Sequence, residues 1–187
     1  MEIRQYLASL NLFTRSEIEN ALGYFKSKSI AKSDYLIREG NICTSVAFVS
    51  SGVFRTFYRD NIGKELTYCI TFPGTFMAAY SSYITGTETI ENIQALTDCE
   101  LLIIQKRDIE SLASKSRHWL LFLKLMAEQQ YIELEYRIFQ LQKEKAKVRY
   151  ENLLHKHPEY SKHIPLQYLA SYLGITQRHL SRIRKRN

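Results

Sequence analysis

Apolar and polar positions follow different periods along the chain, and each change of period predicts a change of structure. Two segments near the N-terminus, Ile3 to Leu10 and Thr14 to Leu22, have helical spacing, and the second opens with the capping box Thr14-Arg15-Ser16-Glu17. From Tyr24 to Gln105 the sequence breaks into short runs rich in Val, Ile, Phe, Tyr and Thr, separated by glycines. This second pattern is typical of an all-β sandwich or barrel.

The clearest hairpin signal lies within this β region. Two alternating runs, Val53 to Arg59 and Lys64 to Phe72, are joined through Asp60-Asn61-Ile62-Gly63. Polar turn residues and a glycine between two such runs predict a β-hairpin.

Helical spacing returns after the β region. Arg107 to Ala113 predicts a short helix, and Arg117 to about Lys143 predicts a long one without Pro or Gly. The long helix carries an apolar stripe, which requires a partner: either its own barrel or a second copy of the chain. The heptad-like spacing favours a parallel dimer, although Gln130 and Arg137 interrupt the stripe and could fix its register or face a ligand. The expected dimer residues are Leu120, Leu123, Ala127, Leu134, Ile138 and Leu141.

The segment from Pro165 to Arg186 has the pattern of two helices joined by a tight turn. Gly174 stands where the chain must turn with φ above zero, and Thr176 can cap a second helix whose apolar side is Leu180 and Ile183. The pattern indicates a helix-turn-helix, although an ordinary helical hairpin packed on a core would have similar spacing.

The distribution of charge favours the helix-turn-helix. Residues 142–187 hold eleven Lys or Arg against three acids, a net charge of +8, whereas residues 1–141 have a net charge of −1 within the total of +7. Basic residues gathered beside such a motif are the footprint of phosphate contact, so we expect DNA as the partner. Gln177, Arg178 and Arg182 are expected to read base edges. The expected contact residues are Thr176, Gln177, Arg178, His179, Ser181, Arg182, Lys185 and Arg186.

Composition excludes several other classes of protein. No apolar run approaches the roughly 20 residues of a membrane helix, and the N-terminus lacks the apolar block of a signal peptide, so we expect a cytoplasmic protein without membrane contact. Cys43, Cys69 and Cys99 are odd in number and lie in apolar stretches, which favours buried thiols over disulfides or a metal site.

Nothing in the sequence indicates an enzyme. A barrel could hold a metal on clustered histidines, but no histidine lies in the β region. Phosphate-binding glycine loops, nucleophile elbows and zinc-ligand spacings are also absent from the sequence. We therefore expect no catalytic residues, no metal and no cofactor.

The order of these parts resembles the Crp/Fnr family of bacterial transcription regulators over essentially the whole chain. The resemblance rests on Gly40, Gly52, the Gly63 to Glu65 turn, Pro73-Gly74 and the block LASYLGITQRHLSRIRK. It implies an α+β fold with an N-terminal β-roll (a double-stranded β-helix) in a sensor domain at 1–116, a long dimerisation helix at 117–143 and a helix-turn-helix domain at 144–187. It also implies a homodimer, double-stranded DNA with a palindromic operator, RNA polymerase and a small-molecule effector as partners.

The chain departs from the family in its effector pocket. Members that bind cyclic nucleotides carry a Gly-Glu pair for the ribose and an Arg-Ser pair for the phosphate, where this chain has Ala78-Ala79 and Thr89-Ile90. A buried phosphate requires a cation or several donors, so a cyclic nucleotide is not the expected effector. The pocket would take another small molecule, or would be filled by its own side chains. Its expected residues are Ala78, Ala79, Tyr80, Ser81, Ser82, Thr87, Thr89 and Gln130.

Other branches of the family, and its C-terminal wing, also lack their signatures here. Iron–sulfur and haem sensors require clustered cysteines or an axial histidine, and the β region has neither. Relatives continue into a β-hairpin wing, whereas this sequence stops at Asn187; either Arg184, Lys185 and Arg186 take over the wing's role, or the chain is an incomplete gene product. We expect a sequence-specific regulator; the alternative is a small-molecule sensor or interaction module whose basic tail binds nucleic acid without sequence preference.

Overall fold

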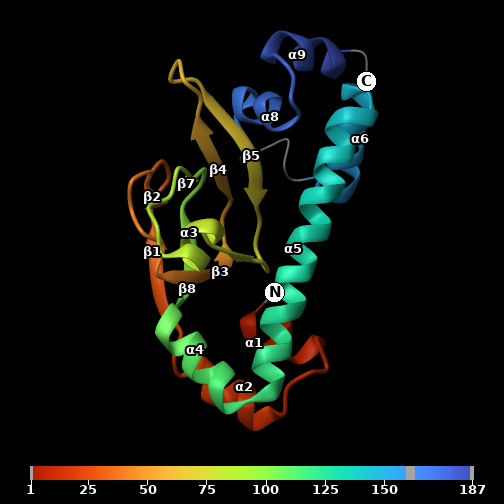
Figure 1. Ribbon diagram of the computed structural model, residues 1–187. Helices are drawn as coiled ribbons and strands as arrows, with labels where there is room; N and C mark the ends of the chain where they lie inside the picture. Colours follow the sequence, from red (N-terminus) through yellow and green to blue (C-terminus); the bar gives the residue numbers. More distant parts are fainter. Residues whose placement is uncertain (1, 159–162, 186–187) are drawn as a thin grey trace.

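The computed structural model describes residues 2–158 and 163–185 and has an α+β fold (Figure 1). Its helices are α1 (Ile3–Ser9), α2 (Arg15–Leu22), α3 (Tyr80–Thr85), α4 (Lys106–Lys115), α5 (Arg117–Lys143), α6 (Ala146–Lys156), α8 (Leu166–Tyr172) and α9 (Gln177–Lys185). Its strands are β1 (Lys26–Ile30), β2 (Tyr35–Ile37), β3 (Ser45–Ser51), β4 (Phe54–Arg59), β5 (Glu65–Thr71), β6 (Phe76–Met77), β7 (Asn92–Ala95) and β8 (Cys99–Gln105).

The strands form a β-roll of two antiparallel four-stranded sheets. One sheet has the order β1-β8-β3-β6 and the other β2-β7-β4-β5. The tight connection from β3 to β4 depends on Gly52, whose φ is +89°. A Cβ at this position would lie only 2.4 Å from Sγ of Cys99, so the close approach of backbone requires glycine.

The predicted hairpin is confirmed as β4 and β5, which pair antiparallel from Phe54–Thr71 to Arg59–Glu65. Its loop is held by Asp60, whose Oδ1 accepts hydrogen bonds from the backbone N–H groups of Ile62 and Lys64. The hairpin projects from the roll and ends beside α8 (Figure 1). This projection brings the β-roll against the C-terminal helices.

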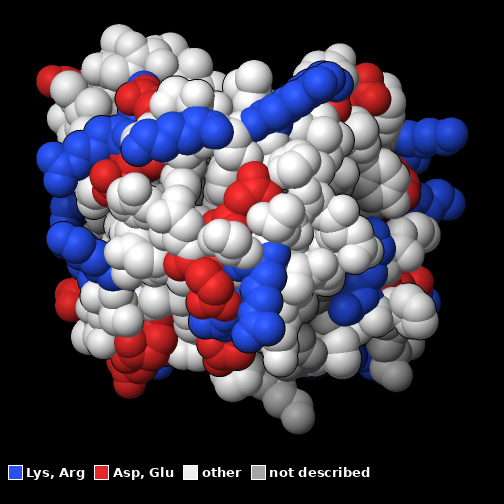
Figure 2. All heavy atoms as spheres, turned by 90° about the horizontal axis from the view of Figure 1, so that it is seen from below, with Lys and Arg blue, Asp and Glu red and all other residues white. Residues whose placement is uncertain are grey.

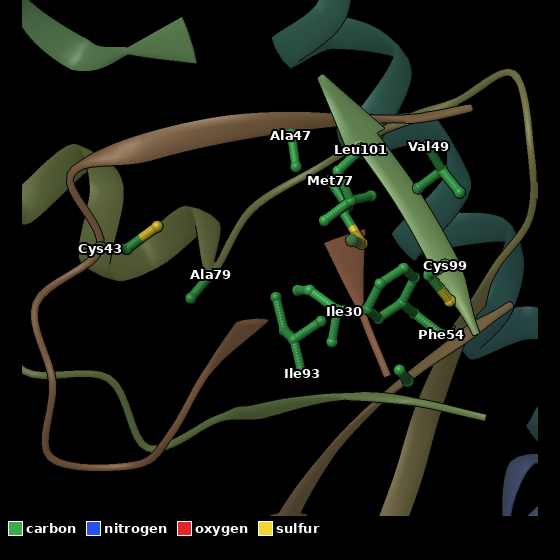
Figure 3. Packing of buried hydrophobic residues seen from close by; sticks show 11 residues of the cluster. Ile30, Cys43, Ala47, Val49, Phe54, Met77, Ala79, Ile93, Cys99 and Leu101 are labelled. Atoms are coloured by element: carbon green, nitrogen blue, oxygen red, sulfur yellow. The ribbon is translucent and has the colours of Figure 1, made fainter. Parts of the chain in front are cut away.

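Buried apolar side chains gather in three places within the described residues. The first cluster fills the roll around Phe54, Ile30 and Ile93, with Cys43 and Ala79 to one side (Figure 3). The second lies where α1, α2, α4 and the start of α5 cover β3 and β8. The third joins the C-terminal helices to the roll and consists of Val53, Leu96, Tyr150, Ile164, Leu169, Ala170, Leu173, Leu180 and Ile183.

The predicted capping box of α2 is confirmed, and its Glu17 also bonds to the residue that precedes α5. Thr14 Oγ1 accepts from the Glu17 N–H at 3.2 Å, and Glu17 Oε2 accepts from the Thr14 N–H at 2.9 Å. Glu17 also accepts from the hydroxyl of Ser116, whose oxygen in turn accepts from the first N–H groups of α5. The carboxylate therefore ties α2 to the beginning of the long helix.

Helix α5 begins and ends at the residues that the sequence predicts, Arg117 and Lys143. Its first turns lie on the roll, because Trp119 and Phe122 are buried in the second cluster. Beyond this point the helix runs along one side of the molecule towards α6 (Figure 1). None of the described helices has the length and apolar character needed to cross a membrane.

Candidate nucleic-acid interface and sensor pocket

The turn between α8 and α9 has the geometry that a helix-turn-helix requires. Gly174 has φ +68°, the N–H of Gly174 donates to the Ser171 carbonyl, and the N–H of Ile175 donates to the Ala170 carbonyl at 3.0 Å. This pair of hydrogen bonds is a Schellman motif, which ends a helix sharply through a left-handed residue. A Cβ on Gly174 would also lie 3.0 Å from Cδ2 of Leu141 on α5, so the turn packs directly against the long helix.

Helix α9 presents a polar, basic surface. Thr176 Oγ1 accepts from the N–H of His179 at 3.2 Å and caps the helix, while Leu180 and Ile183 are buried below it. The described residues of α9 include no Asp or Glu. Of the predicted contact residues, Ser181 is half-buried and Arg186 lies outside the described residues. The exposed ones are Thr176, Gln177, Arg178, His179, Arg182 and Lys185.

Two arginines outside α9 hold this unit in place. Arg149 of α6 is buried and donates from Nε and Nη2 to the Leu173 carbonyl, at 3.2 and 2.9 Å, and from Nη1 to the Gln140 and Glu144 carbonyls. Arg137 of α5 donates to the Tyr172 carbonyl, and its guanidinium lies 4.0 Å from the centre of the Tyr172 ring. A cation at a helix C-terminus is favoured by the helix dipole, and here two cations serve the same end of α8.

The opposite end of the molecule has a different charge pattern. Figure 2 shows the face at the far end from α9, where Lys and Arg side chains alternate with Asp and Glu. Mixed charges give no extended field of one sign. The two ends of the molecule therefore differ in their charge pattern.

The predicted dimer stripe on α5 is largely uncovered in the single chain. Leu123 packs partly against the second cluster, and Leu141 approaches Gly174. Leu134 is 54% exposed, and Leu120, Ala127, Ile138 and Leu141 are also exposed. Tyr131 is exposed beside this stripe, whereas Leu121, Leu125, Ile132, Tyr136 and Phe139 form a second exposed apolar strip on the opposite side of the helix. Exposed apolar stripes on a long helix are typical of an interface between helices.

A partly open cavity of about 360 Å³ lies at one side of the roll. It is bounded by β2, by the loop that follows β2, and by Ala78, Ala79 and Ile93. At its edge, Cζ of Arg38 lies 3.5 Å from the centre of the Tyr35 ring. The full lining is Tyr35, Leu36, Ile37, Arg38, Asn41, Ile42, Cys43, Thr44, Ser45, Ala78, Ala79 and Ile93.

Only two of the predicted pocket residues, Ala78 and Ala79, line this cavity. Two of the others, Ser82 and Thr89, bond to backbone groups instead, as short polar side chains readily do. Buried Ser82 accepts from the Cys43 N–H and donates to the Thr87 carbonyl, and Thr89 Oγ1 accepts from the Glu91 N–H.

The remaining predicted pocket residues make other contacts. Tyr80 stacks on Tyr83, the Ser81 carbonyl and the Thr87 hydroxyl bond to Thr85, and Gln130 donates to Glu133 on exposed α5. The loop of residues 38–45 lacks a hydrophobic pattern, so sequence reasoning missed it; Gly40, whose φ is +84° in the structure, is the residue that could have pointed to a turn there.

The cysteines lack the surroundings of a redox or metal site. Cys43, Cys69 and Cys99 are free thiols, and burial raises the pKa of both Cys69 and Cys99. A raised pKa keeps a thiol protonated and unreactive. Within the described residues, no group of His, Cys, Asp and Glu has the arrangement of a metal site.

Comparison with known proteins agrees with this architecture. Residues 27–116 match the family of the cyclic nucleotide-binding domain. FixK2 from Bradyrhizobium japonicum has a similar structure, with a TM-score of 0.76 at 16% sequence identity over 87% of this chain and 83% of that chain. A search of curated proteins found no match.

Two further solved structures cover almost the whole chain. The c-di-GMP responsive global regulator CLP from Xanthomonas campestris has a TM-score of 0.72 at 19% identity, over 92% of this chain and 91% of that chain. A transcriptional regulator of the Crp/Fnr family from Eubacterium rectale has a TM-score of 0.74 at 17% identity, over 97% of this chain and 87% of that chain. Residues 27–116 are thus similar to a cyclic nucleotide-binding domain, and the chain as a whole has a fold similar to that of the Crp/Fnr transcription regulators.

Proposed function

We propose that the chain is a sequence-specific DNA-binding transcription regulator of the Crp/Fnr type. The observation that carries this proposal is α9: a capped helix, anchored by Leu180 and Ile183, whose outer surface offers exposed cations and amides and no acid. The N-terminal residues of a recognition helix reach the base edges in the major groove, which gives Gln177, Arg178 and Arg182 this role. His179, Ser181, Lys185 and Arg186 would contact phosphates or neighbouring bases.

The regulator would act as a homodimer formed along α5. The exposed apolar face that includes Leu134 and Ile138 supports this arrangement, because a parallel helix pair would cover it. Two copies would present two α9 helices, and a palindromic site with half-sites about 34 Å apart is the matching geometry. Contact with RNA polymerase would follow from the same regulatory role.

The roll would respond to a small molecule other than a cyclic nucleotide, or would not be gated. Buried Ala79 carries no carboxylate, and Thr89 uses its hydroxyl as an acceptor for a backbone N–H. The cavity instead combines apolar walls with Asn41, Ser45 and the exposed Arg38. A small polar molecule with an apolar portion would suit such a lining.

The test begins with selection of binding sites from random DNA, followed by affinity measurements on the recovered site at fixed salt. Arg178→Ala and Arg182→Ala should each relax the preference at particular base pairs, by about 1 to 3 kcal/mol per lost bidentate contact. Lys26→Ala with Lys28→Ala removes two exposed cations from β1 and is the matched control. Equal affinity for all sequences would support the alternative, a sensor module with a basic tail that binds nucleic acid nonspecifically.

A further inference from the structure

Helix α8 covers the open edge of the roll. Strand β5 is the last strand of its sheet, so its outward N–H groups have no neighbouring strand. The N–H of Thr67, on this edge, donates to Oγ of Ser171 on α8 at 2.9 Å. The sensor roll and the first helix of the helix-turn-helix are therefore joined by a direct hydrogen bond between residues 104 positions apart.

A buried arginine makes the second contact between the two parts. Arg55 of β4 is 1% exposed, and its Cζ lies 3.9 Å from the centre of the Phe57 ring and 3.6 Å from that of Tyr168. The guanidinium is thus held between a ring from its own strand and a ring from α8. A desolvated cation on aromatic faces is among the stronger contacts of this kind.

The roll supplies the hydrogen bonds of Arg55, and α8 supplies its cover. Nε and Nη2 donate to Gln94 Oε1 at 2.9 and 2.7 Å, and Nη2 donates to Glu65 Oε2 at 2.6 Å. Nη1 has no hydrogen-bond partner within the described part of the chain. The face of the Tyr168 ring stabilises the buried guanidinium, and Arg55 loses this contact if α8 moves away.

In this docked arrangement the recognition surface stays free. Gln177, Arg178 and Arg182 are exposed while Tyr168 and Ser171 contact the roll. The C-terminal end of α8 is held by Arg137 and Arg149. Helix α8 is therefore held by the roll, by α5 and by α6, and its orientation sets the direction of α9.

We propose that Arg55, a residue of the sensor roll, is a positioning residue for DNA binding. Its contact with Tyr168 holds the helix-turn-helix in the orientation in which α9 meets DNA. A unit that swings freely would occupy that orientation only part of the time, and its apparent affinity falls by that fraction. This inference rests on the proposed function of the chain as a specific DNA-binding protein.

The experiment combines a direct measure of docking with a measure of binding. Tyr168→Leu removes the ring and keeps an apolar side chain on half-buried α8, so the roll keeps its own packing; Ser171→Ala removes the acceptor of Thr67 independently. Amide hydrogen exchange of β5 reports docking, and the Kd for the selected site reports function. Tyr168→Leu should speed exchange at Thr67 and weaken specific binding about tenfold, as expected for loss of one desolvated cation–π contact.

Three further variants identify the cause. Tyr168→Phe keeps the ring and should rescue both readouts. Arg59→Lys is the matched control, because Arg59 lies on the same strand and bonds the same Glu65 at 3.3 Å. Unlike Arg55, it is exposed, and none of its described contacts is with α8. Arg59→Lys should leave exchange and affinity at wild-type values, whereas Arg55→Lys, which loses the flat guanidinium, should behave like Tyr168→Leu.

Three results would overturn the inference. Unchanged exchange in Tyr168→Leu would mean that docking does not depend on the ring, and faster exchange with an unchanged Kd would mean that docking does not position α9. Tighter binding by Tyr168→Leu would make the docked state inhibitory. Wild-type protein without any sequence preference would overturn the proposed function as well, and it is distinguished from the first three because they all occur with specific wild-type binding.

Discussion

The guanidinium of Arg149 donates two hydrogen bonds to the carbonyl of Leu173, from Nε at 3.2 Å and from Nη2 at 2.9 Å. Leu173 is the C-cap of α8, directly before the turn that leads to α9. Through Nη1 the same side chain reaches the Gln140 and Glu144 carbonyls at the end of α5. One buried cation thus joins the end of the long helix to the start of the turn.

Replacing this cation should destabilise the C-terminal helices. Arg149→Met keeps much of the side-chain volume but leaves buried carbonyls without donors, and we expect a loss of about 2 to 4 kcal/mol in the free energy of unfolding. Urea denaturation followed by circular dichroism measures it. Lys147→Met is the control, since Lys147 is exposed on the same helix and pairs with Glu151 at 3.5 Å, worth under about 1 kcal/mol. Equal losses in both variants would show that Arg149 has no special role.

The exposed stripe of α5 should be the dimer interface. Leu134→Glu would place a carboxylate against its symmetry mate in an apolar seam, a change that costs several kcal/mol. The variant should sediment as a monomer and lose affinity for a full palindrome. Ile62→Glu makes the same change in the hairpin loop, where Ile62 is 87% exposed, and should remain dimeric. Wild-type protein that sediments as a monomer at micromolar concentration would contradict the dimer.

Cyclic AMP should not bind at micromolar concentration. The resemblance to cyclic nucleotide-binding members of the family assigns Ala79 and Thr89 to the positions of a carboxylate and a guanidinium, and one missing charge-assisted hydrogen bond costs about 1.5 to 3 kcal/mol. With the ribose contact also lost, affinity falls to the millimolar range, because about 1.4 kcal/mol corresponds to a factor of ten. Calorimetry on protein that is active in DNA binding is the measurement. Clear heat of binding at micromolar concentration would mean that other residues of the cavity donate hydrogen bonds to the phosphate.

Glu17 makes stability depend on pH in the acid range. The hydroxyl of Ser116, then the N–H of Thr14, with further bonds from His118, lower the pKa of Glu17 from 4.5 to about 2. Because the folded-state pKa is the lower one, this stabilisation is present above about pH 4.5 and is lost as pH falls towards 2.

Glu17→Gln should therefore reduce the free energy of unfolding at pH 7 and flatten its decline below pH 4.5. Denaturant titrations between pH 2 and 7 measure this, and Glu128→Gln, which removes an exposed carboxylate from α5, is expected to keep the wild-type slope. An equally steep decline in Glu17→Gln would contradict the assignment.

The helices and hairpin could be predicted because their signals are local. The capping box at Thr14, the glycine at 174 and the unbroken spacing from Arg117 to Lys143 each specify a boundary within a few residues. The candidate recognition helix follows from the same kind of pattern, since Leu180 and Ile183 alone fix which side is buried.

The contacts that hold the parts together could not be predicted in the same way. Arg55 contacts Tyr168 and Arg149 contacts Leu173, and each pair joins residues that are distant in the sequence and on different elements. From the sequence alone, an arginine is predicted to lie on the surface, because only the folded chain supplies the aromatic rings and carbonyl groups that allow its side chain to be buried. The cavity was missed for a related reason: the loop of residues 38–45 has no periodic pattern, whereas Ser82 and Thr89 look available but bond to nearby backbone.

The most direct test of the central claim is the ratio of two affinities, measured at one salt concentration for the selected palindrome and for an unrelated duplex of equal length. A specific regulator is expected to bind its site at least about 10³-fold more tightly than other DNA. Loss of most of this ratio in Arg178→Ala with Arg182→Ala, but not in Lys26→Ala with Lys28→Ala, would attribute it to α9. A ratio near one for the wild-type protein would contradict sequence-specific recognition and leave only nonspecific attraction to phosphate.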